Sequence, residues 1–167
     1  MPLTITKNVF SEELLKRIYD FSRDGKQPTK ANFFGWSATV VGTSNAIFLF
    51  ELEEDLKQAV AKELIDKGIL KKMPKVWAAN IYLMSRGSFI PWHDDGNHKY
   101  TCTVYLNKVW NPNWNGYFIY EDGQERKALI PEYNTSVSFI PPKMHTSTLT
   151  SIDAPLRETL QIFVDEE

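Results

Sequence analysis

From Lys75 onward the sequence consists of short runs rich in β-branched and aromatic residues, separated by clusters of Gly, Pro and Asn. Runs of this kind are typical of strands, and the helical period of apolar residues is absent from this part of the chain. About eight closely spaced strands predict a sandwich or jelly roll. The expected strands are residues 76–84, 89–93, 100–106, 116–121, 127–130, 135–140, 146–150 and 158–164. Residues 39–51 are a further candidate for strands at an edge of the sheet.

Two amphipathic helices are expected before these strands. Ser11 is a suitable N-cap, and Glu12 and Glu13 follow it as an acidic first turn before apolar residues recur at helical spacing. In residues 52–64 a leucine or valine recurs every fourth position through a charged segment that stops near Gly68. Both helices therefore have one apolar face that can pack on a sheet.

The predicted fold is mostly β with flanking α-helices. We expect a double-stranded β-helix (jelly roll) core with the N-terminal helices packed on one sheet. Residues 1–167 are expected to form a single domain, with helical support over about 1–74 and the jelly-roll core over about 75–165. No internal repeat, low-complexity tract or linker divides the sequence.

Composition narrows the possible functions. The chain has 167 residues, and its net charge of −2 disfavours nucleic acid as a partner, because phosphate binding usually needs a basic surface. A single cysteine excludes an intramolecular disulfide, and the N-terminus lacks the features of a signal peptide, so a reducing, cytoplasmic location is expected. No stretch approaches the roughly 18 apolar residues of a membrane span. No feature of the sequence predicts an oligomeric state.

The strongest candidate for a functional site is a metal centre of His93, Asp95 and His145. Side chains at i and i+2 of a strand point to the same side, so His93 and Asp95 can reach one ion from one segment. Two imidazoles and one carboxylate on one face of an octahedral ion leave three positions open, which is the ligand set of non-haem Fe(II) oxygenases. Alternation places Asp94 on the opposite side, as a solvated or turn-stabilising residue.

Arg157 and Thr159 are candidates for binding a second ligand. Arg157 lies at the start of the last predicted strand, and Thr159 shares its face. A guanidinium fork with a hydroxyl beside it suits one end of a dicarboxylate. An iron-bound 2-oxo acid with a distal carboxylate would bridge the metal and this arginine.

Other reactive side chains have simpler interpretations. His98 lies in a predicted turn over residues 96–99, where we expect it to be exposed to solvent. Cys102 has no CxxC partner and is interpreted as a buried strand residue.

These residues resemble those of a known family. The arrangement His93-x-Asp95, His145 and Arg157 is similar to that of Fe(II)/2-oxoglutarate-dependent dioxygenases. The run TCTVYLNKVWN and the following GYFIYEDG resemble the prolyl 4-hydroxylase branch, which includes the oxygen-sensing prolyl hydroxylases. The similarity covers about residues 75–165, and the N-terminal helices match only in kind.

The resemblance implies a role for each of these positions. His93, Asp95 and His145 would bind Fe(II), and Arg157 would pair with the C5 carboxylate of 2-oxoglutarate. Tyr105, in the YLN run, would hydrogen-bond the same carboxylate.

Two positions depart from the family pattern. The family commonly has a tyrosine where this chain has Met84, and Tyr82, two residues earlier on the same face, either replaces that tyrosine or packs in the core. Relatives often have two glycines where this chain has only Gly116.

The implied activity is hydroxylation of a C–H bond. Fe(II), 2-oxoglutarate and O2 would be required, ascorbate is a further candidate, and succinate and CO2 would be co-products. A prolyl residue in a peptide or protein is the leading substrate, and a free amino acid or another small molecule is second. Trp110 and Trp114 could form a lid and Trp92 a wall of the substrate site, although a packed turn is the simpler interpretation of the loop.

Two other functions remain open. A nucleobase demethylase of the same superfamily is weakly indicated by Asn80-x-Tyr82, but the net charge and the single arginine near the end argue against it. A non-catalytic jelly-roll binding module is the alternative outside enzymes, and the retention of all three ligands and of Arg157 argues against it.

Overall fold

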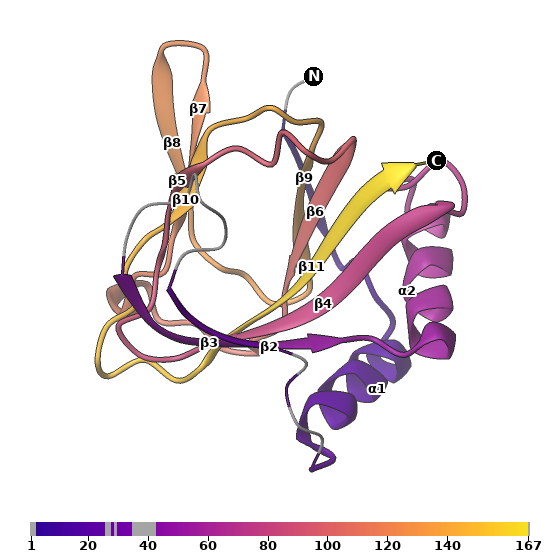
Figure 1. The fold of residues 1–167 in the computed structure, drawn as a ribbon, viewed down its shortest axis with the longest axis horizontal. Coiled ribbons are helices and arrows are strands. Elements are labelled where there is room, and N and C mark those ends of the chain that lie inside the picture. Colours follow the sequence, from indigo (N-terminus) through magenta and orange to yellow (C-terminus); the bar gives the residue numbers. More distant parts are fainter. Residues whose placement is uncertain (1–2, 26–27, 29, 35–42, 167) are drawn as a thin grey trace.

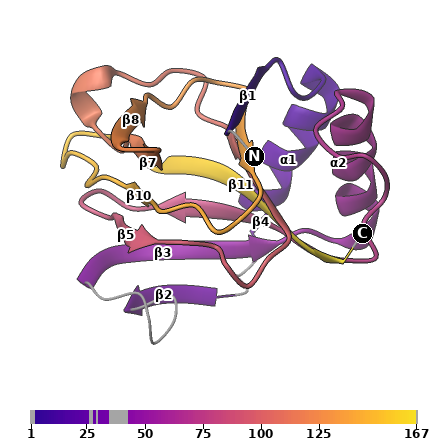
Figure 2. The same cartoon turned by 90° about the horizontal axis from the view of Figure 1, so that it is seen from above.

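The computed structural model describes residues 3–25, 28, 30–34 and 43–166. Two antiparallel sheets face each other, and two helices cover the outer face of the larger sheet (Figures 1 and 2). This arrangement confirms the predicted mostly β architecture with a jelly-roll core. None of the helices in the described ranges is long and apolar enough to cross a membrane.

The larger sheet has seven strands, in the order β1-β9-β6-β11-β4-β3-β2. Its members are β1 (Thr4–Lys7), β2 (Lys30–Phe34), β3 (Thr43–Glu51), β4 (Val76–Met84), β6 (Tyr100–Tyr105), β9 (Thr135–Phe139) and β11 (Arg157–Glu166). The smaller sheet has the order β5-β10-β7-β8. Its members are β5 (Ile90–His93), β7 (Phe118–Asp122), β8 (Glu125–Leu129) and β10 (His145–Ser147). A short 3₁₀ helix, η1 (Pro112–Trp114), lies between β6 and β7.

All eight strands predicted after Lys75 are present, with ends that differ by a few residues. The candidate edge segment 39–51 contains β3, and residues 39–42 lie outside the described part. β1 and β2 were not predicted. The part of the chain before Lys75 therefore contributes strands as well as helices.

Both predicted helices form. α1 (Glu12–Arg23) begins at Ser11, whose hydroxyl accepts a hydrogen bond from the amide of Leu14, and α2 spans Glu54–Asp66. Their apolar faces pack on the outward-facing residues of the central strands in one buried cluster. Cys102 belongs to this cluster, as expected of a buried strand residue.

Strand alternation gives β4 and β11 two different faces. Ala79, Ile81 and Leu83 of β4 pack toward the helices, as do Leu160, Ile162 and Val164 of β11. The intervening residues point toward the smaller sheet. Because β4 and β11 pair in register, with Arg157 opposite Met84 and Gln161 opposite Asn80, their inner faces form one continuous wall. This wall and the smaller sheet enclose the candidate site.

Candidate metal centre and adjoining cavity

His93, Asp95 and His145 come together at the end of two paired strands. His145 on β10 lies opposite His93 on β5, and Asp95 follows His93 by two residues. The Nε2 atoms of His93 and His145 lie 3.6 and 3.7 Å from the two carboxylate oxygens of Asp95. Ligands about 2.1 Å from one ion at right angles would be about 3 Å apart, so a small contraction around a metal would complete the site.

The backbone fixes which nitrogen of each imidazole faces this centre. His93 Nδ1 lies 2.7 Å from the carbonyl of Pro91, and His145 Nδ1 lies 2.7 Å from the carbonyl of Lys143. A carbonyl can only accept, so Nδ1 carries the proton in both rings. Each Nε2 then presents a lone pair toward Asp95, which is the tautomer a metal requires.

Burial keeps His145 in its neutral form. Its pKa is lowered from 6.5 to about 4, first by burial and then by His93, and the negative charge of Asp95 opposes this shift. Neutral imidazole is the form that binds a metal, so His145 does not have to lose a proton at neutral pH.

This shift predicts acid sensitivity of the metal-free protein. The unfolded chain takes up a proton at His145 below about pH 6.5, whereas the folded chain does so only near pH 4, so stability falls as the pH drops through this window. Urea unfolding of the chelator-treated protein should show roughly 2 kcal/mol less stability at pH 5 than at pH 7. His145→Gln should show a smaller loss, and an equal loss in both proteins would contradict the prediction.

The triad faces a cavity of about 330 Å³ that also contains Arg157 and Tyr82. Ile90 and Phe118 supply apolar walls, so the space is partly screened from water. The candidate metal centre and the candidate anion-binding arginine therefore share one cavity, as the sequence predicted.

Arg157 is a buried cation without an acidic partner among the described residues. Its side chain is only 2% exposed, and burial lowers the pKa of its guanidinium. Nε donates to the carbonyl of Gly116 at 3.1 Å, and one terminal nitrogen lies 3.1 Å from the sulfur of Met84, a weak acceptor. An uncompensated buried charge is costly, so this arrangement favours an anionic ligand.

Tyr105 and Tyr82 flank Thr159 on the inner wall. The hydroxyl of Tyr105 is buried and has no hydrogen-bond partner of good geometry in the described structure, although the guanidinium of Arg157 is close enough to oppose the rise of its pKa. Burial raises the pKa of Tyr105 to about 12, so the hydroxyl keeps its proton and can donate to an anion. Burial and the charge of Asp95 also raise the pKa of Tyr82.

The structure places these candidates at different depths. Tyr82 lines the cavity, whereas Met84 lies behind it against the guanidinium of Arg157. Thr159 is fully buried, and its hydroxyl accepts a hydrogen bond from the side-chain amide of Gln161 at 3.1 Å. The roles of Tyr82, Tyr105 and Thr159 in binding a co-substrate stay predictions.

Gly116 lies where a side chain would press on Arg157. It has φ of +68°, and a Cβ there would lie 3.0 Å from Thr150 Cγ2, 3.1 Å from Arg157 Cδ and 3.1 Å from Trp110 Cζ2. We expect Gly116→Ala to lower stability by about 1–3 kcal/mol and to weaken 2-oxoglutarate binding, because both the backbone and Arg157 must shift. Gly123→Ala is the matched control, with a similar φ of +66° and no neighbour within 4 Å. Thermal melts and titration calorimetry would measure the effects, and equal behaviour of the two variants would contradict the expectation.

The three tryptophans expected at the substrate site do not line this cavity. Trp110 and Trp114 pack edge to face at 5.5 Å, and Trp110 donates to the carbonyl of Asn115 at 2.9 Å. The guanidinium of Arg126 lies 5.2 Å from the ring centre of Trp92. The two loop tryptophans therefore pack on each other, and both the lid and the contact of these rings with substrate stay predictions.

His98 lies in the expected turn with its side chain 30% exposed, and it also has contacts that the sequence did not indicate. Its Nδ1 lies 2.5 Å from Asp165, its ring stacks on Phe163 at 4.6 Å, and it lines the cavity. These contacts could not be read from the sequence, because Asp165 and Phe163 are far away in sequence and reach His98 only through the pairing of the sheet. Asp94, by contrast, accepts a hydrogen bond from the amide of Gly96 at 3.0 Å, which confirms a turn-stabilising role.

Sequence reasoning singled out Asn80 but missed that it belongs to a polar row on the inner wall. Asn80, Thr103 and Gln161 line the cavity, and the hydroxyl of Thr103 donates to Gln161 at 2.6 Å. Alternation from Tyr82 back to Asn80, and from Thr159 on to Gln161, was the signal that could have identified two of them.

The site therefore combines a jelly roll, a histidine–aspartate–histidine cluster and a buried arginine that opens the last strand. No protein-family model and no curated protein sequence matches the chain significantly. Solved structures do match. A Pseudomonas putida prolyl-4-hydroxylase aligns with a TM-score of 0.70 at 13% identity, over 99% of this chain and 92% of that one.

Two further structures match similarly. A 2OG-Fe(II) oxygenase family oxidoreductase from Burkholderia pseudomallei has a TM-score of 0.72 at 15% identity, over 99% of this chain and 85% of that one. A Trichoplax adhaerens prolyl hydroxylase, solved with a peptide fragment of hypoxia inducible factor, has a TM-score of 0.70 at 12% identity, over 98% of this chain and 83% of that one. At these identities the comparison establishes the shared fold.

Proposed function

We propose that the protein is an Fe(II)- and 2-oxoglutarate-dependent hydroxylase whose prime substrate is a prolyl residue in a peptide. In the balanced reaction, 2-oxoglutarate, O2 and a C–H bond give succinate, CO2 and a C–OH group. One oxygen atom enters the alcohol and the other enters succinate.

The observation that carries this proposal is the buried guanidinium of Arg157. It shares a cavity with His93, Asp95 and His145, and no carboxylate among the described residues neutralises it. A ligand with one end that chelates a metal and a distal carboxylate meets both requirements at once. 2-Oxoglutarate is a dicarboxylate of this kind.

The three ligand side chains fit Fe(II). Two neutral imidazoles and one carboxylate are suitable donors for it, and their ligand atoms lie within 4.8 Å of one another. When bound, the ion would supply the redox chemistry that activates O2.

The other residues of the site would orient and shield the reactants. Arg157 would hold the distal carboxylate through its terminal nitrogens, and the unpartnered hydroxyl of Tyr105 would be a second donor. Ile90 and Phe118 would keep water away from this end of the cavity. Correct placement of the reacting atoms is then the main contribution of the protein.

The prolyl assignment is supported by the fold comparison and by the resemblance of the YLN segment to prolyl hydroxylases. Two of the similar structures are prolyl hydroxylases, and one was solved with a peptide. Rigid aromatic faces such as Trp92 and Trp114 suit a proline ring, and these two residues precede His93 and Phe118, which line the cavity, by one and four positions.

The test is mass spectrometry of a panel of proline-containing peptides incubated with the protein, Fe(II), ascorbate and 2-oxoglutarate. A substrate should gain about 16 mass units, one oxygen atom, in a one-to-one ratio with succinate. A matched panel of free amino acids addresses the second substrate class. Hydroxylation of an amino acid alone would overturn the prolyl assignment and leave the reaction class intact.

Succinate release without any prime substrate tests the reaction class by itself. Slow uncoupled turnover is expected from the wild-type protein and should disappear on chelation. No succinate under any of these conditions would overturn the proposal of an enzyme and favour a binding module.

A further inference from the structure

Asn107 follows β6 and lies on the side of β11 away from β4, far from Arg157 in sequence and not among the residues that line the cavity. β6 ends at Tyr105, which is paired with Thr159, so regular strand pairing on this side stops before Arg157 is reached. The first residues of β11 therefore need another partner on this side.

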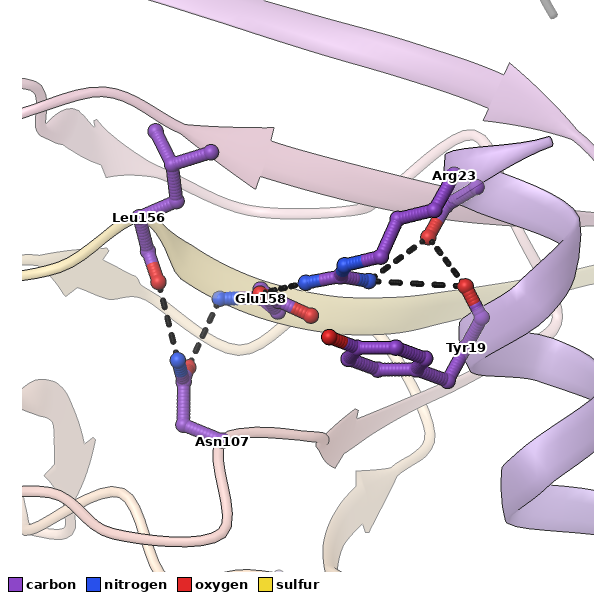
Figure 3. A network of polar contacts seen from close by, with 6 residues as sticks. Tyr19, Arg23, Asn107, Leu156 and Glu158 are labelled. Atoms are coloured by element: carbon purple, nitrogen blue, oxygen red, sulfur yellow. Dashed lines mark hydrogen bonds and ion pairs between the residues drawn. The ribbon is translucent and has the colours of Figure 1, made fainter. Parts of the chain in front are cut away.

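The side chain of Asn107 supplies that partner (Figure 3). Its amide nitrogen donates to the carbonyl of Leu156 at 2.8 Å, and its oxygen accepts from the amide of Glu158 at 2.8 Å. One carboxamide thus binds the backbone on both sides of Arg157. Leu106 adds a backbone bond to the carbonyl of Glu158 at 3.0 Å.

Glu158 extends this contact to helix α1. Its carboxylate pairs with Arg23, and the guanidinium of Arg23 lies over the ring of Tyr19 at 3.6 Å. Figure 3 shows the resulting chain of contacts from the helix, through Glu158, to Asn107. The Glu158 side chain is only 12% exposed, so this ion pair is better shielded than a surface pair.

We infer that Asn107 is a positioning residue for Arg157. It holds the start of β11 in register, and this sets the direction of the guanidinium toward the metal centre. A guanidinium that binds a carboxylate through two parallel hydrogen bonds is sensitive to small changes in its direction. A more mobile backbone at Arg157 should therefore weaken the binding of the carboxylate although the positive charge is retained. The inference rests on the proposed function, because it takes the distal carboxylate of 2-oxoglutarate as the ligand of Arg157.

The test is titration calorimetry of the full-length Mn(II)-loaded protein with 2-oxoglutarate and, separately, with oxalate. Oxalate chelates a metal through adjacent oxygens and has no distal carboxylate to meet Arg157. Asn107→Ala should weaken the affinity for 2-oxoglutarate by about tenfold, which is the effect of losing one good hydrogen bond. The affinity for oxalate should not change. General damage to the fold would weaken both ligands alike.

Asn111→Ala is the matched control. The Asn111 side chain also accepts from a backbone amide, that of Asn113 at 2.9 Å, in the same connecting segment, and this bond lies within the loop instead of on β11. This variant should melt at a lower temperature and bind 2-oxoglutarate normally. The double variant Asn107→Ala/Arg157→Met should bind 2-oxoglutarate no more weakly than Arg157→Met alone, since both changes act through one contact.

The outcomes separate the two proposals. Equal loss of 2-oxoglutarate and oxalate binding, or no loss in Asn107→Ala, overturns the positioning role while the proposed function stands. Failure of the wild-type protein to bind 2-oxoglutarate overturns both. If Asn107→Ala does not fold, Asn107→Asp keeps the acceptor for Glu158 but not the donor to Leu156, and the same selective loss is expected of it.

Discussion

Replacement of His145 with alanine should abolish metal binding and succinate formation. The imidazole would supply one of the three ligands that the described residues offer, and His98 is not a substitute, because Asp165 holds it outside this group. The same outcome is expected for His93→Ala and Asp95→Ala. Metal content by mass spectrometry and succinate release would be measured together. Circular dichroism should show that the sheets are intact.

Asp94→Ala is the control for this set. The carboxylate of Asp94 is exposed and binds the amide of Gly96, so its loss should leave metal content and turnover close to normal. Retention of activity in all three ligand variants would exclude this metal centre. Loss of metal in Asp94→Ala alone would show that the wrong carboxylate had been assigned.

Arg157→Met should raise the KM for 2-oxoglutarate by about one to several orders of magnitude, because each hydrogen bond to a charged group contributes roughly 1.5–3 kcal/mol. Methionine fills much of the space left by the arginine but cannot bind a carboxylate. The KM for the prime substrate should change far less, since in the proposed complex the guanidinium would bind only the end of 2-oxoglutarate that is distal to the metal. Steady-state kinetics with each reactant varied in turn would measure both constants.

Arg157→Lys separates charge from geometry. Lysine keeps the positive charge but lacks the planar fork, so an intermediate KM is expected. An unchanged KM for 2-oxoglutarate in Arg157→Met would mean that another residue binds the distal carboxylate. The unpartnered hydroxyl of Tyr105 would then be the next residue to test.

The sequence was most informative where one local rule decides the structure. The cap at Ser11 and the alternating strands after Lys75 depend on neighbours in sequence, and they formed as expected. β1 could not be foreseen, because its four residues are stabilised by pairing with β9, more than a hundred residues away. Short edge strands of this kind have little pattern of their own.

The candidate site shows the same division. The spacing of His93 and Asp95 and the position of Arg157 at the start of a strand were readable, because both follow from strand alternation. Other features of the site depend on backbone geometry that residue types do not indicate. Examples are the orientation of His145 Nδ1 toward the carbonyl of Lys143 and the contact of Arg157 with Gly116. The partners of His98 were missed for a related reason, since they belong to a distant strand.

The place of β11 in the larger sheet has a consequence for how the protein folds. β11 is the last strand in the order of the chain, yet it lies at the centre of the sheet, between β6 and β4. During synthesis on the ribosome, β4 and β6 therefore lack their shared partner until β11 has been made. Until then their unpaired backbone groups can pair with strands of other chains. Contacts such as that of Arg157 with Met84 join distant parts of the sequence, and such long-range pairing is associated with slow folding. The strand that carries Arg157 is thus also the one that joins the two parts of the larger sheet.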